Sequence, residues 1–202
     1  MSNENNKGHL ILVMAPSGSG KRVLVQEVRD KFPQISYLVS CTTRTPRPRE
    51  VDSVDYHFLS ESEFDKKIAD GEFMEWVSFG GNKYGTLRSS LLDPMSQGKI
   101  VLNEVDVRGV ESCLDLIPRT QATVIYIDAG GWETLRARAI SRAPIDEAEL
   151  QQRYQRYLVE REAKNIADAV IDNRDGHLQE AKNEIVKIVQ SITERLESEG
   201  KG

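Results

Sequence analysis

Short apolar runs alternate with amphipathic segments along most of the chain. The runs predict buried strands at 10–14, 37–39, 100–102, 124–127 and 169–171. The segments between them repeat apolar residues at helical spacing. They predict helices near 21–32, 107–116, 132–141, 147–164 and 178–196. Strands rich in Val, Ile and Leu that alternate with helices are typical of an α/β fold with a mainly parallel sheet.

The region from Thr42 to about Ser90 breaks this rhythm. Its aromatic and β-branched residues predict short strands at 56–59, 73–77 and 84–86. One helix is expected among them, starting at Ser60 or Ser62, because Ser60 and Glu63 have the spacing of a capping box. We therefore expect an inserted, mostly β subdomain within an otherwise α/β chain.

Composition narrows the class of protein. The chain has 202 residues, of which 39% are hydrophobic and 29% charged, as in a globular protein. No apolar run reaches membrane-spanning length, and residues 1–7 lack the apolar core of a signal peptide. A net charge of −5 argues against a dedicated nucleic-acid binder. Cys41 and Cys113 lack C-x-x-C spacing, which favours reduced thiols and a cytoplasmic location over a disulfide or metal site.

The sharpest local signal follows the first apolar run. It is the segment Ala15-Pro16-Ser17-Gly18-Ser19-Gly20-Lys21-Arg22. A strand, a Gly-rich turn and a helix aim backbone N–H groups and a helix dipole at one point, where a phosphate binds. The segment nearly matches the P-loop, G-x-x-x-x-G-K-[ST], but Ala15 replaces the first glycine and Arg22 replaces the hydroxyl residue that helps to hold Mg²⁺. The alternative is a chance Gly-rich loop, and the flanking strand and helix favour the phosphate site.

The segment from Ser40 to Glu50 is rich in arginine, proline and hydroxyl residues. Arg44 and Arg47 leave a backbone that prolines stiffen. Guanidinium groups bind phosphate oxygens in pairs, and hydroxyls such as that of Ser40 complete the shell. A solvated basic loop explains this segment alone equally well.

A third group contains Tyr56, Glu75 and Tyr84. Tyrosines donate to phosphate, and a carboxylate accepts two parallel N–H bonds from N1 and N2 of guanine, a pair that adenine does not offer. Glu75 beside a phosphate site would therefore select guanine. In the alternative interpretation, the tyrosines are core aromatics and Glu75 is a surface residue.

Two further groups of charged residues follow later in the chain. Glu104 and Asp106 end a buried strand, where open α/β sheets bind ligands and where carboxylates could orient Mg²⁺ waters; the alternative is a helix N-cap. Arg138 and Arg142 share one helix face, and Arg153 follows. Arginines over a transferred phosphoryl group would stabilise its charge, whereas surface pairing with glutamates is the alternative.

Together these segments resemble the guanylate kinase family from about Leu10 to Val189. The matching motifs lie at 15–21, 40–47, 54–58, 71–76, 81–86 and 104–109. A late Asp172-Asn173-Arg174-Asp175 is similar to the family's Asn-Asp-Asp stretch. The resemblance implies a single guanylate kinase-like domain over 1–202. Its parts would be a P-loop core at about 8–35, 91–129 and 165–198, a GMP-binding insert at about 36–90 and a helical lid at about 130–164.

The resemblance also implies a reaction: transfer of the ATP γ-phosphoryl group to GMP or dGMP. Mg²⁺ would be held mainly by phosphates and waters, with no dedicated protein metal site. ATP and GMP would be the partners, without nucleic acid or membrane, and the protein would be a monomer or weak homo-oligomer.

The residue roles follow from the same resemblance. The GMP phosphate would contact Ser40, Arg44, Arg47, Tyr56 and Tyr84. Glu75 and Thr86 would read guanine, and Asp106 would line the site. ATP would bind Ala15, Pro16, Ser17, Gly18, Ser19, Gly20, Lys21, Arg22 and Asn173, the last near adenine. The catalytic set would be Lys21, Arg44, Arg138, Arg142 and Arg153.

Three departures from the family pattern leave alternatives open. No hydroxyl follows Lys21, residues 141–146 lack the usual Arg-Gly-Thr turn, and Arg174 replaces the first Asp of the late motif. One alternative is a catalytically weakened guanylate-kinase-like module that binds GMP or a phosphorylated peptide. Another is a related P-loop kinase with a different phosphorylated acceptor, against which Glu75 argues. The retained Lys21 and lid arginines favour the enzyme.

Overall fold

The computed structural model describes residues 8–141 and 145–199. Its core is a five-stranded sheet of order β2-β7-β1-β8-β9. The strands are β1 (His9–Met14), β2 (Ser36–Tyr37), β7 (Ile100–Val105), β8 (Ala122–Asp128) and β9 (Ala169–Asp172). All four pairings between them are parallel. The predicted α/β fold with a parallel sheet is confirmed.

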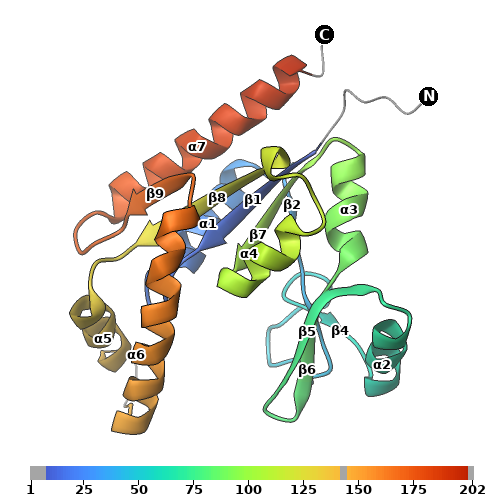
Figure 1. Cartoon of the computed structure of the whole chain (residues 1–202), viewed down its shortest axis with the longest axis horizontal. Coiled ribbons are helices and arrows are strands. Elements are labelled where there is room, and N and C mark those ends of the chain that lie inside the picture. The colour runs from blue at the N-terminus through green and yellow to red at the C-terminus, as the bar shows by residue number, and fades with distance from the viewer. Residues whose placement is uncertain (1–7, 142–144, 200–202) are drawn as a thin grey trace.

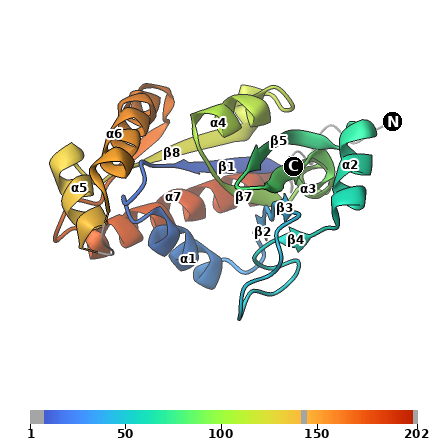
Figure 2. The same ribbon diagram turned by 90° about the horizontal axis from the view of Figure 1, so that it is seen from below.

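Helices cover both faces of this sheet (Figures 1 and 2). On one face lie α1 (Lys21–Lys31) and α7 (Leu178–Glu199), and on the other lie α3 (Arg88–Ser96) and α4 (Val107–Leu114). Successive side chains of a strand point to opposite faces, so the unbroken apolar run of β1 serves both layers. Every residue of β1 is buried.

The segment after β2 builds a second, smaller sheet of order β4-β3-β6-β5. Its strands are β3 (Cys41–Thr42), β4 (His57–Phe58), β5 (Phe73–Phe79) and β6 (Asn82–Leu87), and α2 (Glu61–Ala69) packs beside them. Phe64 of α2 stacks on Phe73 at 4.3 Å between ring centroids, which gives this part its own core. The capping box of Ser60 and Glu63 is present as predicted. β2 itself pairs with β7 of the large sheet.

A helical arm leaves the core after β8. It contains α5 (Trp132–Ile140) and α6 (Glu147–Glu162), and η2 (Ala163–Ile166) returns the chain to β9. Trp132 holds the two helices together, with ring centroids 5.1 Å from Tyr154 and 5.8 Å from Tyr157. Another short turn, η1 (Arg119–Gln121), precedes β8.

The helical arm and the small sheet extend from the same side of the core (Figure 1). The reason is topological: the chain enters both parts from the carboxyl ends of core strands, and those ends share one edge of a parallel sheet. The P-loop follows the carboxyl end of β1 and therefore lies at this edge too.

The observed elements differ from the sequence-based expectations in several places, among them the short strand β3, which was not predicted. β7 continues to Val105 rather than stopping at 102, and β2 is shorter than expected. The helix α3 was missed, because Pro94 within it removes a backbone donor and is unfavourable inside a helix. Burial of Leu91 and Met95 in the core outweighs that cost. No helix in the described ranges is long and apolar enough to cross a membrane.

Candidate active site

The P-loop is held in its shape by glycine geometry and buried hydrogen bonds. Gly18 and Gly20 have φ angles of +92° and +84°, a region that L side chains rarely adopt. Ser19 is buried, and both its backbone N–H and its hydroxyl donate to the carbonyl of Pro16, at 3.1 and 2.6 Å. A Cβ added at Gly20 would lie 2.6 Å from Nδ2 of Asn173. The loop therefore requires glycine at position 20 for conformation and for space.

Lys21 leaves this loop toward the end of β7. Its Nζ donates to the Val105 carbonyl at 3.4 Å. Burial lowers the pKa of Lys21, while the nearby carboxyl groups of Glu104, Glu160 and Asp106 act in the opposite direction. The ammonium group thus stands beside several carboxylates at the carboxyl edge of the sheet.

Glu160 is a member of this cluster that the sequence did not reveal. It lies on α6, and the Ser17 backbone N–H is close enough to its carboxyl group to lower the pKa of that group. Burial raises the pKa of Glu160, and this effect outweighs the opposing effects of the Ser17 N–H and of Lys21. The available signal was its spacing of seven residues from Arg153, which places both on one face of α6.

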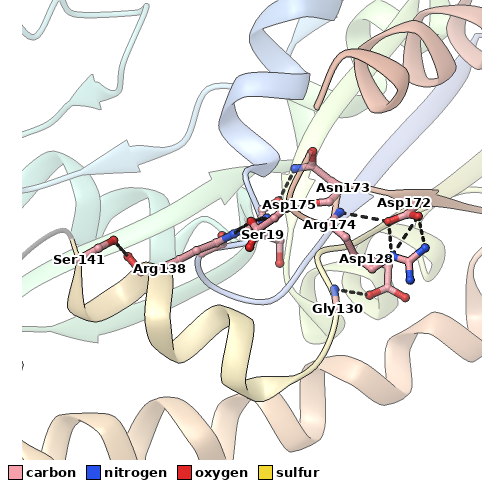
Figure 3. Close-up of polar contacts among 10 residues, drawn as sticks. Ser19, Asp128, Gly130, Arg138, Ser141, Asp172, Asn173, Arg174 and Asp175 are labelled. Carbon is pink, nitrogen blue, oxygen red and sulfur yellow. Dashed lines mark hydrogen bonds and ion pairs between the residues drawn. The ribbon is translucent and has the colours of Figure 1, made fainter. Parts of the chain in front are cut away.

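The late motif supports the P-loop from the side (Figure 3). The side-chain amide of Asn173 is buried and donates to the Ser19 carbonyl at 2.7 Å. Arg138 donates to the Asn173 carbonyl at 3.1 Å and pairs with Asp175 at 2.6 Å. Arg174 turns away from the loop and pairs with Asp172 at 2.6 Å, which lowers the pKa of that carboxyl group.

The predicted lid arginines reach the P-loop from both helices of the arm. Arg138 of α5 donates to the Gly18 carbonyl at 3.4 Å. Arg153 of α6 donates to the Ser17 hydroxyl at 3.4 Å and is held by Glu149 at 2.7 Å. Arg142, the third predicted lid arginine, lies outside the described residues.

A cleft of about 460 Å³ lies between α1 and the small sheet. All five residues predicted for the GMP phosphate line it: Ser40, Arg44, Arg47, Tyr56 and Tyr84. The cleft is also lined by side chains of the core, namely Arg22, Arg29, Tyr37 and Glu104. The lining thus contains three tyrosines and four arginines beside the carboxylates of Glu50, Asp55 and Glu104, and it offers an anion several hydrogen-bond donors.

Arg44 is positioned by the small sheet and its loop. Its guanidinium group pairs with Glu50 at 2.9 Å, and both side chains are mostly shielded from solvent. It also lies 5.5 Å from the ring centroid of Tyr56. Hydrogen bonding to Glu50 raises the pKa of Arg44 and lowers that of Glu50. The group is charged and oriented before any ligand arrives.

Glu75 and Thr86, predicted to read the base, and Asp106, predicted to line the site, are not among the residues that line this cleft. Glu75 of β5 lies opposite Thr86 of β6, and the Thr86 hydroxyl is 3.3 Å from that of Ser40, which does line it. Burial first, and then the charge of Asp106, raise the pKa of Glu75. Asp106 accepts from the Gly109 backbone N–H at 2.8 Å, so the N-cap interpretation of Asp106 is confirmed.

A larger cleft of about 730 Å³ lies beside β8, β9 and α6. None of the predicted site residues lines it. Its main charges are already paired, Asp128 with Lys164 at 2.7 Å and Asp172 with Arg174. The residues predicted for the GMP phosphate therefore line the smaller cleft and not this one.

Comparisons with known proteins show the family to which this chain is similar. The family model described as Guanylate kinase matches residues 7–194. A guanylate kinase of Rubrobacter xylanophilus is 36% identical over 186 residues, covering 92% of this chain and 95% of the relative. One from Malacoplasma penetrans is 33% identical over 197 residues, covering 97% and 98%. The crystal structure of guanylate kinase from Anaplasma phagocytophilum superposes with a TM-score of 0.64 at 25% identity, over 92% of this chain and 86% of that one.

Proposed function

The chain belongs to the guanylate kinase family, and we propose that its P-loop and its small sheet bind the two substrates of that reaction on facing sides of one site. Its function is that of a nucleoside monophosphate kinase, which transfers the γ-phosphoryl group of ATP to GMP. The family assignment gives the reaction. The residue roles below are inferred from the geometry of this chain.

The acceptor phosphate is assigned to the cleft beside the small sheet. Arg44 and Arg47 would each offer paired N–H donors to its oxygens, and Ser40, Tyr56 and Tyr84 would donate hydroxyls. Support comes from the convergence of these five side chains on one cleft from three separate segments. A solvated basic loop would not require such convergence.

The guanine base is assigned to Glu75, with Thr86 and Asp106 beside it. An ionised Glu75 would accept hydrogen bonds from N1 and N2 of guanine, whereas adenine would leave the carboxylate without donors. The half-buried position of Glu75 and its raised pKa fit a carboxyl group that gains partners only when the base binds.

The ATP phosphates are assigned to the P-loop residues 15–20 and to Lys21. Arg138 and Arg153, together with Arg142, would lie over the transferred group from the helical arm. Asn173 contributes by holding the loop at Ser19, and its neighbourhood is the expected position of adenine. Glu160 lies near the Ser17 N–H, a donor that a phosphate oxygen would also use.

Phosphoryl transfer between these sites needs positioning more than acid–base chemistry. The GMP phosphate is already anionic and nucleophilic at neutral pH, so no general base has to activate it. The arginines and Lys21 offset repulsion between two polyanions, and closure of the arm over the P-loop would exclude water that could otherwise accept the phosphoryl group.

The residues near Lys21 fit a magnesium ion bound through waters. Carboxylate oxygens suit Mg²⁺, and Glu104 and Asp106 both lie close enough to Lys21 to affect its pKa. Each has one oxygen engaged, by Tyr37 at 3.0 Å and by Gly109. The described residues contain no cluster of three or more potential ligands. Mg²⁺ would neutralise charge on the ATP phosphates, with Glu104 and Asp106 orienting its waters.

Domain limits and location are also proposals. We assign residues of about 36–90 to GMP binding and about 130–164 to the lid, supported by the separate small sheet and helical arm. Cys41 and Cys113 are buried and free, which favours a reducing compartment such as the cytoplasm.

The observation that carries the residue assignment is the meeting of the predicted phosphate-binding side chains in one cleft, which is also lined by Arg22, the residue after Lys21. A coupled assay of ADP formation from Mg²⁺–ATP tests it. We expect turnover that requires GMP and is not supported by AMP. GMP binding without turnover would instead support the catalytically weakened module.

A further inference from the structure

The face of α1 that borders the acceptor cleft contains two arginines. Arg22, Val25, Gln26 and Arg29 all line the cleft. Their spacing of three, four and seven residues places them along one stripe of the helix. The rotation of α1 is fixed because Leu24 and Val28 are fully buried against the sheet on the other side. Arg22 is therefore directed to the acceptor cleft by the packing of its own helix.

The second arginine of this stripe is occupied by aromatic and carboxylate neighbours. The Arg29 guanidinium lies 4.2 Å from the ring centroid of Tyr37. The Tyr37 hydroxyl donates to Glu104 at 3.0 Å. These contacts stabilise a wall of Arg29, Tyr37 and Glu104 on the core side of the cleft. Arg22 lies near enough to this wall to affect the pKa of Tyr37.

Arg22 itself is exposed and forms none of the ion pairs found among the described residues. Arg44, across the cleft, is held by Glu50. Among the ion pairs within residues 8–141 and 145–199, none includes Arg22. Its guanidinium group is exposed and has no carboxylate partner among these pairs, and it borders a cleft that other arginines also line. Its N–H donors are therefore available to bind an anion.

In the P-loop pattern, the position of Arg22 is occupied by a hydroxyl residue. A Ser or Thr after the P-loop lysine offers an oxygen to Mg²⁺. Arginine has no acceptor and carries a positive charge, so it cannot bind a cation. Residue 22 is therefore suited to bind phosphate rather than Mg²⁺. Because its side chain lines the acceptor cleft, the phosphate within its reach is that of the acceptor.

We propose that Arg22 binds the phosphate of the acceptor nucleotide from the α1 side, opposite Arg44 and Arg47. This inference rests on the proposed function, because the acceptor is GMP. Arg22 directly follows Lys21 in the chain, so one helix turn would hold the donor phosphates with its first residue and the acceptor phosphate with its second. The backbone of α1 would then help to set the distance between the two reacting phosphates.

Calorimetric titration without ATP and without Mg²⁺ tests the assignment. The ligands are GMP and guanosine, which differ only in the phosphate. We expect Arg22→Ser to weaken GMP binding about tenfold or more and to leave guanosine binding within about twofold. Arg22→Lys should recover part of the loss, because it keeps the charge but not the paired donors.

Two controls separate the possible failures. Arg88→Ser removes an exposed arginine from the start of α3, outside the cleft lining, and should leave GMP binding unchanged. Thermal unfolding of each variant checks that the fold is intact, and Arg22→Lys replaces Arg22→Ser if the latter does not fold. Equal GMP affinity in Arg22→Ser and wild type, or a loss confined to a parallel titration with ATP, would overturn the assignment. Failure of the wild type to bind GMP would overturn the proposed function itself.

Discussion

The two parts of the proposed site, the P-loop as its donor side and the cleft as its acceptor side, differ in how they are built. On the donor side, the P-loop depends on backbone conformation: two glycines with positive φ, a buried Ser19, and Asn173 bonded to a loop carbonyl. On the acceptor side, the cleft depends on long side chains brought together from α1, an Arg-Pro loop and the small sheet. We infer that donor binding is inseparable from the core fold, whereas acceptor choice depends on side chains that can change without disturbing it.

The strongest test of this division is Lys21→Met. It removes the one side-chain charge that the P-loop pattern requires, beside the carboxylates of β7 and α6. We expect kcat to fall about 10²–10³-fold, because charge on the transferred group loses a preorganised partner. GMP affinity, measured by calorimetry without ATP, should stay within about twofold. A comparable loss of GMP affinity would mean that the two sides are not separate.

Glu75→Gln probes the acceptor side in the same way. The substitution keeps the size of the side chain and removes one of two acceptors for guanine. We expect kcat/KM for GMP to fall about 10²-fold while KM for ATP stays within about twofold. Glu61→Gln is the matched control, since Glu61 is a carboxylate of the small sheet's helix that pairs with Lys83 at 2.8 Å. If ATP and GMP kinetics decline together, Glu75 is structural.

A pair of glycine substitutions compares backbone demands on the two sides. Gly20→Ala introduces left-handed strain and a Cβ contact of 2.6 Å with Asn173, whereas Gly81→Ala, at φ +77°, meets nothing within 4 Å. We expect losses of about 2 and about 1 kcal/mol in the free energy of unfolding, respectively, measured by urea denaturation. ATP binding should weaken only in Gly20→Ala. Equal destabilisation would show that Asn173 yields easily.

The smallest expected effect is a pH dependence confined to the acceptor side. In the proposed site, guanine would bind the ionised form of Glu75, whose pKa is raised in the free protein by burial and by Asp106. GMP affinity should therefore decline as pH falls through that raised pKa, by at most about tenfold per unit, and level off above it. The second ionisation of the GMP phosphate also falls near pH 6, so Glu75→Gln serves as the reference. The difference between the two profiles isolates Glu75, and identical profiles would contradict its role.

Local patterns were sufficient for much of the fold and part of the site. The predicted core strands and the capped helix at Ser60 were found, since hydrophobic periodicity and capping act over a few residues. The grouping of Ser40, Arg44 and Arg47 at one cleft was predictable because the three lie within one short segment. The helix α3 was not predicted because Pro94 disfavours a helix locally, and only burial against the sheet stabilises it. Glu160 was not predicted because Ser17 and Lys21, which lie near it in the structure, are distant in sequence.

The sequence by itself determined which elements form and which chemical groups are available: a glycine turn for phosphate, arginines in excess at two segments, and a carboxylate suited to guanine. Only the tertiary structure decided which of these groups face one another. Arg22 points to the acceptor cleft because Leu24 and Val28 fix the rotation of α1 by burying its other side. Glu160 lies at the P-loop because the helical arm packs over it. Side-chain direction follows from which face an element buries, and that choice belongs to the packed molecule rather than to any one segment.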